Sequence, residues 1–190
     1  MELLVYLIII SSALVLASAC GFRIFVPPLG LSLVYKLGII ELDTSWSWIG
    51  NSWVFLILSI ATLIEIFAYY LPWLDNFLDV ISTPSAVAAG ILLSAISLDG
   101  VNPGLQWFLA VIGGGSSAGL IQISSSSSRL TSSLITGGFA NPIISTIELF
   151  FAIGIVILIF ALPAISLLLV FFLFLFLKKL LHKLKSRKSP

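Results

Sequence analysis

Four charged residues stand inside or at the edge of long apolar segments: Arg23, Glu65, Arg129 and Glu148. An ionised side chain at membrane depth costs about 2.5–3.5 kcal/mol even on the lenient insertion scale. Such groups are therefore rare, and they pair with one another or face a water-filled cavity. These four residues are the candidate substrate-binding residues of the chain.

The four charges allow three chemical interpretations, and the sequence leaves all three open. Two arginines and two glutamates balance, so two buried ion pairs could hold the helix packing. Alternatively, Arg23 and Arg129 line a polar cavity and bind an anionic group such as a phosphate or a carboxylate. In the third interpretation, Glu65 and Glu148 carry protons or bind a cation.

A second polar candidate site is the pair Asp75 and Asp79. They are four residues apart, so they share one face of a short amphipathic helix expected over 73–81, lying at the membrane interface. Two carboxylates could ligate a hard cation, or they could form the solvated face of that helix. A turn is expected at Ser82–Ser85, before the next helix.

Conventional catalytic and cofactor signatures are missing from the sequence. The single His182 lies in the basic tail, and the single Cys20 closes an apolar segment. There is no His/Cys/Asp spacing for a metal and no phosphate-binding loop after Gly113-Gly114-Gly115. We therefore predict a protein that is not an enzyme and holds no metal and no cofactor.

Composition defines the setting for these residues. Of 190 residues, 59% are hydrophobic and 9% are charged, against about 45–50% and about a quarter in ordinary globular domains. So few charges cannot cover a soluble surface, which excludes a soluble enzyme, a disordered chain and a nucleic-acid-binding domain. The sequence predicts an all-α polytopic integral membrane protein, a single membrane domain over 1–190 in contact with membrane lipids.

The expected spans follow from runs of roughly 17–25 apolar residues. Spans are expected over 3–19, 53–71, 105–123, 143–160 and 165–177. A broken or re-entrant segment is expected at 22–37, which contains the helix-breaking pair Pro27-Pro28. The segment 124–136, which contains five consecutive serines, is ambiguous. Depending on these segments and on the break at Pro163, the count is six or seven spans.

The two halves of the chain show the same order of parts. In each, a helix end rich in small residues leads to an arginine (Arg23, Arg129), and a later span that begins at an asparagine carries an Ile-Glu pair (Glu65, Glu148). The halves are 1–81 and 82–177, followed by a basic tail over 178–190. An inverted repeat of this kind would place a site between the halves. Coincidence of ordinary helix breaks is the alternative.

The chain resembles a widespread family of small bacterial inner-membrane proteins that carry only a domain-of-unknown-function label. The resemblance covers nearly the whole chain and rests on these residues: Gly21, Arg23, Ile64-Glu65, Pro72, Asp75, Asp79, Thr83-Pro84, Gly90, Gly113-Gly114, Arg129, Asn141 and Glu148. It implies a multi-span membrane protein and supplies no activity. The chain departs from the family at Tyr69-Tyr70, where an Asp-Lys-type pair is usual, and at Ser85-Ala86, where a basic residue is usual. These losses count against cation exchange.

These observations favour a membrane transporter or flippase-like protein for a small or amphiphilic anionic solute. Arg23 and Arg129 would bind the solute, and Glu65 and Glu148 would orient them or relay protons. The alternative is a non-transporting accessory or assembly subunit, whose apolar surface packs against a larger membrane complex. A homodimer or such a complex is the expected assembly.

The basic tail predicts the orientation of the protein. Six of the nine Lys and Arg residues lie in the last 13 positions, and the positive-inside rule places such a segment in the cytoplasm, here of a bacterial inner or thylakoid-type membrane. A reporter fused after Pro190 should therefore be active when the reporter requires the cytoplasm. Activity only with a reporter that requires export would contradict this orientation.

Overall fold

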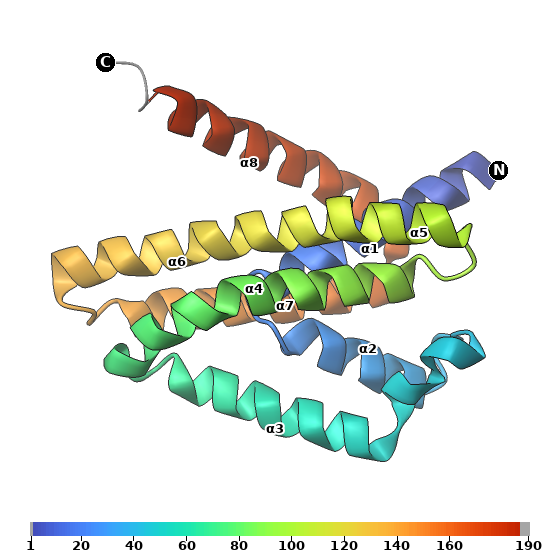
Figure 1. Cartoon of the computed structure of the whole chain (residues 1–190), viewed down its shortest axis with the longest axis horizontal. Helices are drawn as coiled ribbons and strands as arrows, with labels where there is room; N and C mark the ends of the chain where they lie inside the picture. Colours follow the sequence, from blue (N-terminus) through green and yellow to red (C-terminus); the bar gives the residue numbers. More distant parts are fainter. Residues whose placement is uncertain (1, 187–190) are drawn as a thin grey trace.

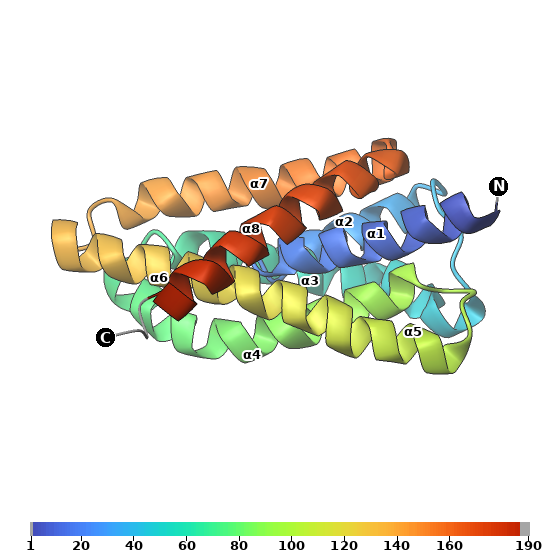
Figure 2. The same cartoon turned by 90° about the horizontal axis from the view of Figure 1, so that it is seen from above.

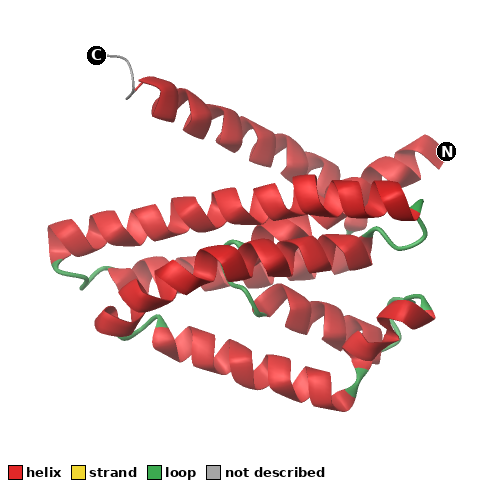
Figure 3. Ribbon diagram, in the orientation of Figure 1, coloured by secondary structure: helices red, strands yellow, loops and turns green. Residues whose placement is uncertain are grey.

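The computed structural model describes residues 2–186, without the side chains of 72–80, 176, 177 and 180–186. The described residues form helices joined by loops (Figures 1 and 3), which confirms the all-α prediction. The elements are α1 (Glu2–Cys20), α2 (Val26–Lys36), η1 (Thr44–Gly50), α3 (Ser52–Ala68), α4 (Pro72–Ser97), α5 (Pro103–Leu109), η2 (Ala110–Gly115), α6 (Ser116–Thr136), α7 (Asn141–Ala161), η3 (Pro163–Ile165) and α8 (Ser166–Ser186).

Helix α1 lies at the centre of the molecule and contacts α2, α4, α6, α7 and α8. Its second half is buried, whereas the apolar residues near its N-terminus are exposed. The buried face joins one hydrophobic cluster with residues of α2, η1, α4, α6 and α7. Its members are Val15, Leu16, Cys20, Leu31, Ile49, Leu93, Ile96, Ala118, Val156 and Ile159. Figure 2 shows α8 running obliquely from the end of α7 across α6.

Close contact between the central helices depends on small residues. A Cβ added to Gly90 of α4 would lie 2.5 Å from the Cβ of Ala118, and one added to Gly114 would lie 2.6 Å from the Cβ of Ser94. A Cβ on Gly21, just after α1, would lie 2.4 Å from the carbonyl oxygen of Ala118. Small residues at such crossings let helix backbones approach closely, which is how helices associate in lipid.

Three helices in the described part of the chain are long and apolar enough to cross a membrane. They are α1, α7 and the 34-residue helix Pro103–Thr136, formed by α5, η2 and α6. A fourth span results if η1 and α3, which meet at 54°, are counted as one. The count of six or seven is not confirmed, because α2, the apolar part of α4 (Ile81–Ser97) and the segment Pro163–Leu175 are shorter than a span requires.

One local prediction was wrong. The expected turn at Ser82–Ser85 lies inside α4, which continues through Pro84, so the boundary between the expected halves also falls within this helix. One proline removes a single backbone donor, and packing of the helix on α1, η2 and α6 outweighs that loss. The serine run 124–128, which the sequence left open, lies within the continuous helix α6. Ser127 and Ser128 donate to carbonyl oxygens one turn earlier in this helix.

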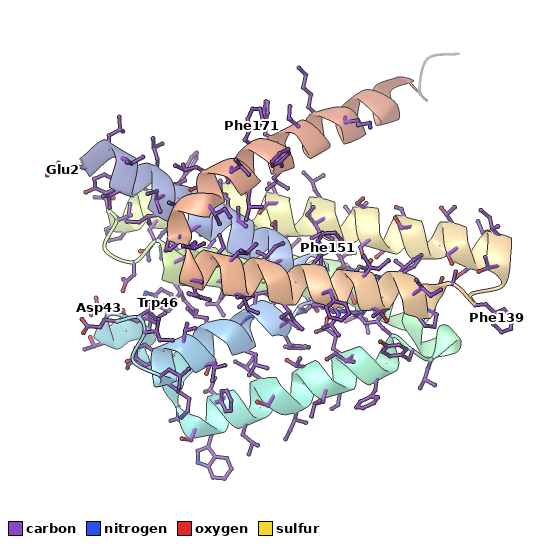
Figure 4. The ribbon with its side chains drawn as sticks, turned by 180° about the vertical axis from the view of Figure 1, so that it is seen from behind. Glu2, Asp43, Trp46, Phe139, Phe151 and Phe171 are labelled. Carbon is purple, nitrogen blue, oxygen red and sulfur yellow. The ribbon has the colours of Figure 1, made fainter. Side chains whose placement is uncertain are left out.

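Several acidic residues lie at one end of the molecule. The N-terminus and the C-terminal end of α8 lie at opposite ends (Figure 1). Figure 4 places Glu2 and Asp43 at one end and Phe139 at the other. Asp99 lies beside Asp43, whose backbone N–H donates to its carboxylate at 2.8 Å. The exposed Lys178 lies on α8. Among the residues whose side chains are described, Glu2, Asp43 and Asp99 thus lie at the end that holds the N-terminus.

The glycine contacts give a stability prediction. Gly90→Ala should lower the free energy of unfolding by about 1–3 kcal/mol, because the new methyl group overpacks against Ala118. The matched control is Gly154→Ala in α7, where an added Cβ meets no atom within 4 Å. This control should be neutral or stabilising by up to about 1 kcal/mol, since alanine favours helix. Unfolding in mild detergent measures both, and equal losses in the two variants would contradict the close crossing.

Candidate functional site

Arg129 and Glu148 form a buried ion pair between α6 and α7. The Nη1 group of Arg129 donates to one carboxylate oxygen of Glu148, and the hydroxyl group of Ser125 donates to the other. The same Nη1 group donates to the Ser125 hydroxyl oxygen at 2.8 Å. Ser125 and Arg129 are four residues apart on one helix, so they share a face. Ser125 therefore contacts both members of the pair. The side chains of Arg129 and Glu148 are 1% and 7% exposed.

Glu65 of α3 binds backbone rather than a cation. Its two carboxylate oxygens accept from the backbone N–H groups of Ile24 and Phe25, at 2.8 and 3.1 Å. These residues immediately precede α2, so the carboxylate lies at the positive end of that helix. Within the described part of the chain, Glu65 makes no ion pair with Arg23. Backbone dipoles thus stabilise the carboxylate of Glu65. The equal numbers of buried arginines and glutamates in the sequence could not indicate this.

The ring of Tyr69 joins the two arginines. The Cζ atoms of Arg23 and Arg129 lie 4.3 and 4.6 Å from the ring centroid, within the roughly 6 Å of a cation–π contact. The two Cζ atoms are therefore no more than about 9 Å apart, the sum of these distances. The Tyr69 hydroxyl group shares a 2.9 Å hydrogen bond with Ser82 of α4. Residues from α3, α4, α6 and the chain after α1 thus meet at one buried ring.

Arg23 is 1% exposed, and its hydrogen bonds use one nitrogen. Its Nη2 group donates to the carbonyl and hydroxyl oxygens of Ser145, at 2.6 and 2.5 Å. Its Nε and Nη1 groups are buried and have no hydrogen-bond partner among the described residues. A buried donor without an acceptor costs about 1–3 kcal/mol. Arg23 is therefore the group in this cluster that has capacity for a further acceptor.

The structure brings together all four charged residues selected from the sequence. It also adds Tyr69, Ser125 and Ser145, which sequence reasoning missed. The signal was helical spacing: Tyr69 follows Glu65 by four residues, and Ser145 precedes Glu148 by three, so each shares a face with a selected charge.

The second candidate site is the pair Asp75 and Asp79 on α4. Asp75 and Asp79 belong to the first part of α4, and their side chains lie outside the described residues. Among the residues that the structure describes, no group of three or more His, Cys, Asp or Glu side chains could hold a metal ion.

One comparison with known proteins gave a match. The model of a family described as a domain of unknown function (DUF4126) matches residues 10–183, a range that contains the whole buried cluster. No curated protein and no solved structure matches the chain.

The ion pair supplies a double-mutant test. Arg129→Gln or Glu148→Gln alone should lower the free energy of unfolding by about 3–5 kcal/mol, since each strands a buried charge. The double variant should recover much of that loss, because two neutral amides can bond to each other and to Ser125. Lys36→Gln, at an exposed cation, is the control and should change stability by less than about 0.5 kcal/mol. Strictly additive losses in the double variant would contradict the pairing.

Proposed function

The chain belongs to the DUF4126 family, and from this premise we propose that it is a bacterial inner-membrane or thylakoid-type protein that moves a small or amphiphilic anionic solute across or within the membrane. Arg23 and Arg129 bind the anionic group. Glu148 orients Arg129, and Glu65 fixes the start of α2 next to Arg23 or relays protons.

The observation that carries the proposal is the state of Arg23. Its guanidinium group is buried, and two of its three nitrogens have no hydrogen-bond partner among the described residues. A guanidinium has five N–H donors and no acceptor, so only an acceptor can satisfy it. An anion is the strongest acceptor for this group, because charge-assisted hydrogen bonds are about twice as strong as neutral ones.

The neighbouring carboxylates are already engaged, which favours an external anion. Glu148 accepts from Arg129 and Ser125, and Glu65 accepts from two backbone N–H groups. Moving either one to Arg23 would strand the groups that it now satisfies. A bound phosphate or carboxylate would satisfy Arg23 without that loss.

The proposal includes the arrangement in the membrane. The C-terminus is cytoplasmic, and the acidic end with Glu2, Asp43 and Asp99 faces the opposite side. The short apolar helices α2, Ile81–Ser97 and Pro163–Leu175 enter the bilayer with the longer ones, which gives six or seven segments in two inverted halves. In this arrangement the arginine cluster lies between the halves 1–81 and 82–177.

A second candidate function is that of an accessory subunit in a homodimer or a larger membrane complex. The observation in its favour is α8, whose exposed face carries Phe171, Phe172 and Phe174. A stoichiometric partner after purification in mild detergent would favour this function. A lone protein that is active in transport would favour the first.

Reconstitution into liposomes tests the proposal. We expect uptake of radiolabelled inorganic phosphate, or exposure of a fluorescent phosphatidylglycerol on the opposite leaflet, above the level of empty liposomes. Arg23→Gln should reduce the active signal roughly tenfold, as expected for loss of a hydrogen bond between charged groups. Lys36→Gln, which removes an exposed cation, is the control. A folded Arg23→Gln protein with undiminished rate, or the absence of both signals in the wild-type protein, would overturn the proposal.

A further inference from the structure

Buried polar residues line the contact between α6 and α7, two helices that run antiparallel from the turn at 137–140 (Figure 1). On α6, every buried residue after Ile121 is polar, and on α7 the first three buried residues are polar. These residues are Gln122, Ser125, Arg129 and Ser132 on α6, and Asn141, Ser145 and Glu148 on α7. We call this contact the polar seam.

Hydrogen bonds connect the two sides of the polar seam. From Ser125 on α6 and from Asn141 on α7, the polar residues follow at intervals of four and then three positions, so each set lies on one face of its helix. Near the turn, the amide group of Asn141 donates to the hydroxyl oxygen of Ser133 at 2.8 Å. Farther in, Glu148 accepts from Arg129 and Ser125. Polar contacts therefore run along this part of the interface.

The inner end of the polar seam is the arginine cluster. Beyond Glu148, the buried residues of α7 are apolar: Ala152, Val156 and Ile159. At this end the chain after α1 lies against both helices, since Gly21 packs on Ala118 of α6 and Arg23 donates to Ser145 of α7. Figure 2 shows α1 between the two helices on the side away from the turn. The seam thus leads to Arg23 and ends there.

The outer end of the polar seam is the turn at 137–140. Thr136 is exposed and Ser133 is half-buried, whereas Ser132 is 8% exposed and Ser145 is 0% exposed. Burial therefore increases from the turn toward the arginine cluster. Figures 1 and 2 place the turn at the same end of the molecule as the C-terminal end of α8. In the proposed orientation, this is the cytoplasmic end.

We propose that the polar seam is the path by which a small hydrophilic anion, such as inorganic phosphate or a short carboxylate, reaches Arg23 from the turn at 137–140. This inference rests on the anion site proposed above, and it narrows the solute from small or amphiphilic anions to small hydrophilic ones. Arg23 is the destination because its Nη2 group binds Ser145 of the seam, while its buried Nε and Nη1 groups have no hydrogen-bond partner among the described residues.

The polar seam is closed in this structure, so an anion enters when α6 and α7 separate near the turn. Each helix has its own support for such a movement, because α6 packs on α4 and α1, and α7 packs on α1 and α2. Each hydrogen bond broken near the turn, such as that between Asn141 and Ser133, has a net cost of about 0.5–1.5 kcal/mol, since water replaces the lost partner. Separation beyond Glu148 would instead expose apolar side chains to water.

The lining of the polar seam also selects the class of solute. Its hydroxyl and amide groups can replace part of the water around a phosphate or a carboxylate group. An acyl chain placed there would gain no apolar contact and would leave these polar groups without partners, which costs about 1–3 kcal/mol for each group. The seam therefore favours a compact anion over an amphiphilic one.

Cysteine accessibility in proteoliposomes tests the path. The single native cysteine is first replaced (Cys20→Ala), and four single-cysteine proteins are made in this background. Ser145→Cys and Ser132→Cys lie in the polar seam, and their controls, Ala152→Cys and Val156→Cys, lie on the apolar continuation of the buried face of α7. The pairs are matched in burial, because Ser145 and Ala152 are 0% exposed and Ser132 and Val156 are 8% exposed.

The reagent is 2-sulfonatoethyl methanethiosulfonate, a membrane-impermeant anion that is added to each side of the membrane in separate reactions. We expect it to modify Ser145→Cys and Ser132→Cys at least about tenfold faster than their controls, since a charged reagent rarely enters an apolar interface. Modification should occur from the side that holds the C-terminal tail. Thermal unfolding identifies the folded variants, and if Ser145→Cys does not fold, Ser132→Cys and Val156→Cys give the comparison.

Protection by solutes tests the destination and the solute class. Saturating inorganic phosphate or succinate, tested separately, should slow modification of Ser145→Cys roughly tenfold. This variant keeps the backbone carbonyl to which Arg23 donates. Adding Arg23→Gln to it should abolish the protection, whereas adding Lys36→Gln, at an exposed cation, should not.

Three results would overturn the inference. The first is equal modification rates in the polar seam and in the folded controls. The second is the absence of protection by both phosphate and succinate, or equal protection when Arg23 is replaced. The third is protection by dodecyl phosphate alone, which would identify an amphiphilic solute. Protection without transport would overturn the proposed function and keep this inference, whereas transport with equal modification rates would do the reverse.

Discussion

Burial of two guanidinium groups in a chain with few polar residues is the constraint on which the centre of this structure depends. Each guanidinium must be satisfied inside the protein, because the apolar exterior offers no acceptors. Arg129 is satisfied by Glu148 and Ser125. Arg23 is satisfied in part by Ser145 and by the ring of Tyr69. These contacts require α3, α6, α7 and the chain after α1 to meet at the two arginines.

Close backbone contact makes this convergence geometrically feasible. Gly21 follows α1 at a place where any Cβ would collide with the Ala118 carbonyl oxygen and with Ile121 of α6. The end of α1 therefore lies directly on α6, and Arg23 follows two residues later. Since Ser125 and Arg129 lie one and two turns after Ile121, this contact sets the separation between the two arginines. Gly21 therefore helps to fix the position of Arg23 relative to Arg129.

The sequence was sufficient to predict an all-helical chain with apolar helices long enough to cross a membrane, and four charged residues that the structure brings together, because composition and isolated charges in apolar runs are local signals. The partners of those charges are not local. Glu65 pairs with backbone N–H groups some 40 residues away in the chain, and Tyr69 was recorded only as a departure from a family pattern. The prediction of a turn at Ser82–Ser85 was wrong for a related reason. A proline predicts a helix break from local sequence, whereas contacts of α4 with distant helices keep this helix continuous. The serine run 124–128 was ambiguous until α6 placed Ser125 against Glu148.

Each arginine and glutamate of the cluster is satisfied in a different way. In the second half, the glutamate pairs with the arginine, so Glu148 neutralises Arg129 directly. In the first half, Glu65 is held by the start of α2, whose N–H groups replace Arg23 as its partner. Because the start of α2 binds Glu65, the buried guanidinium of Arg23 keeps donors without partners among the described residues.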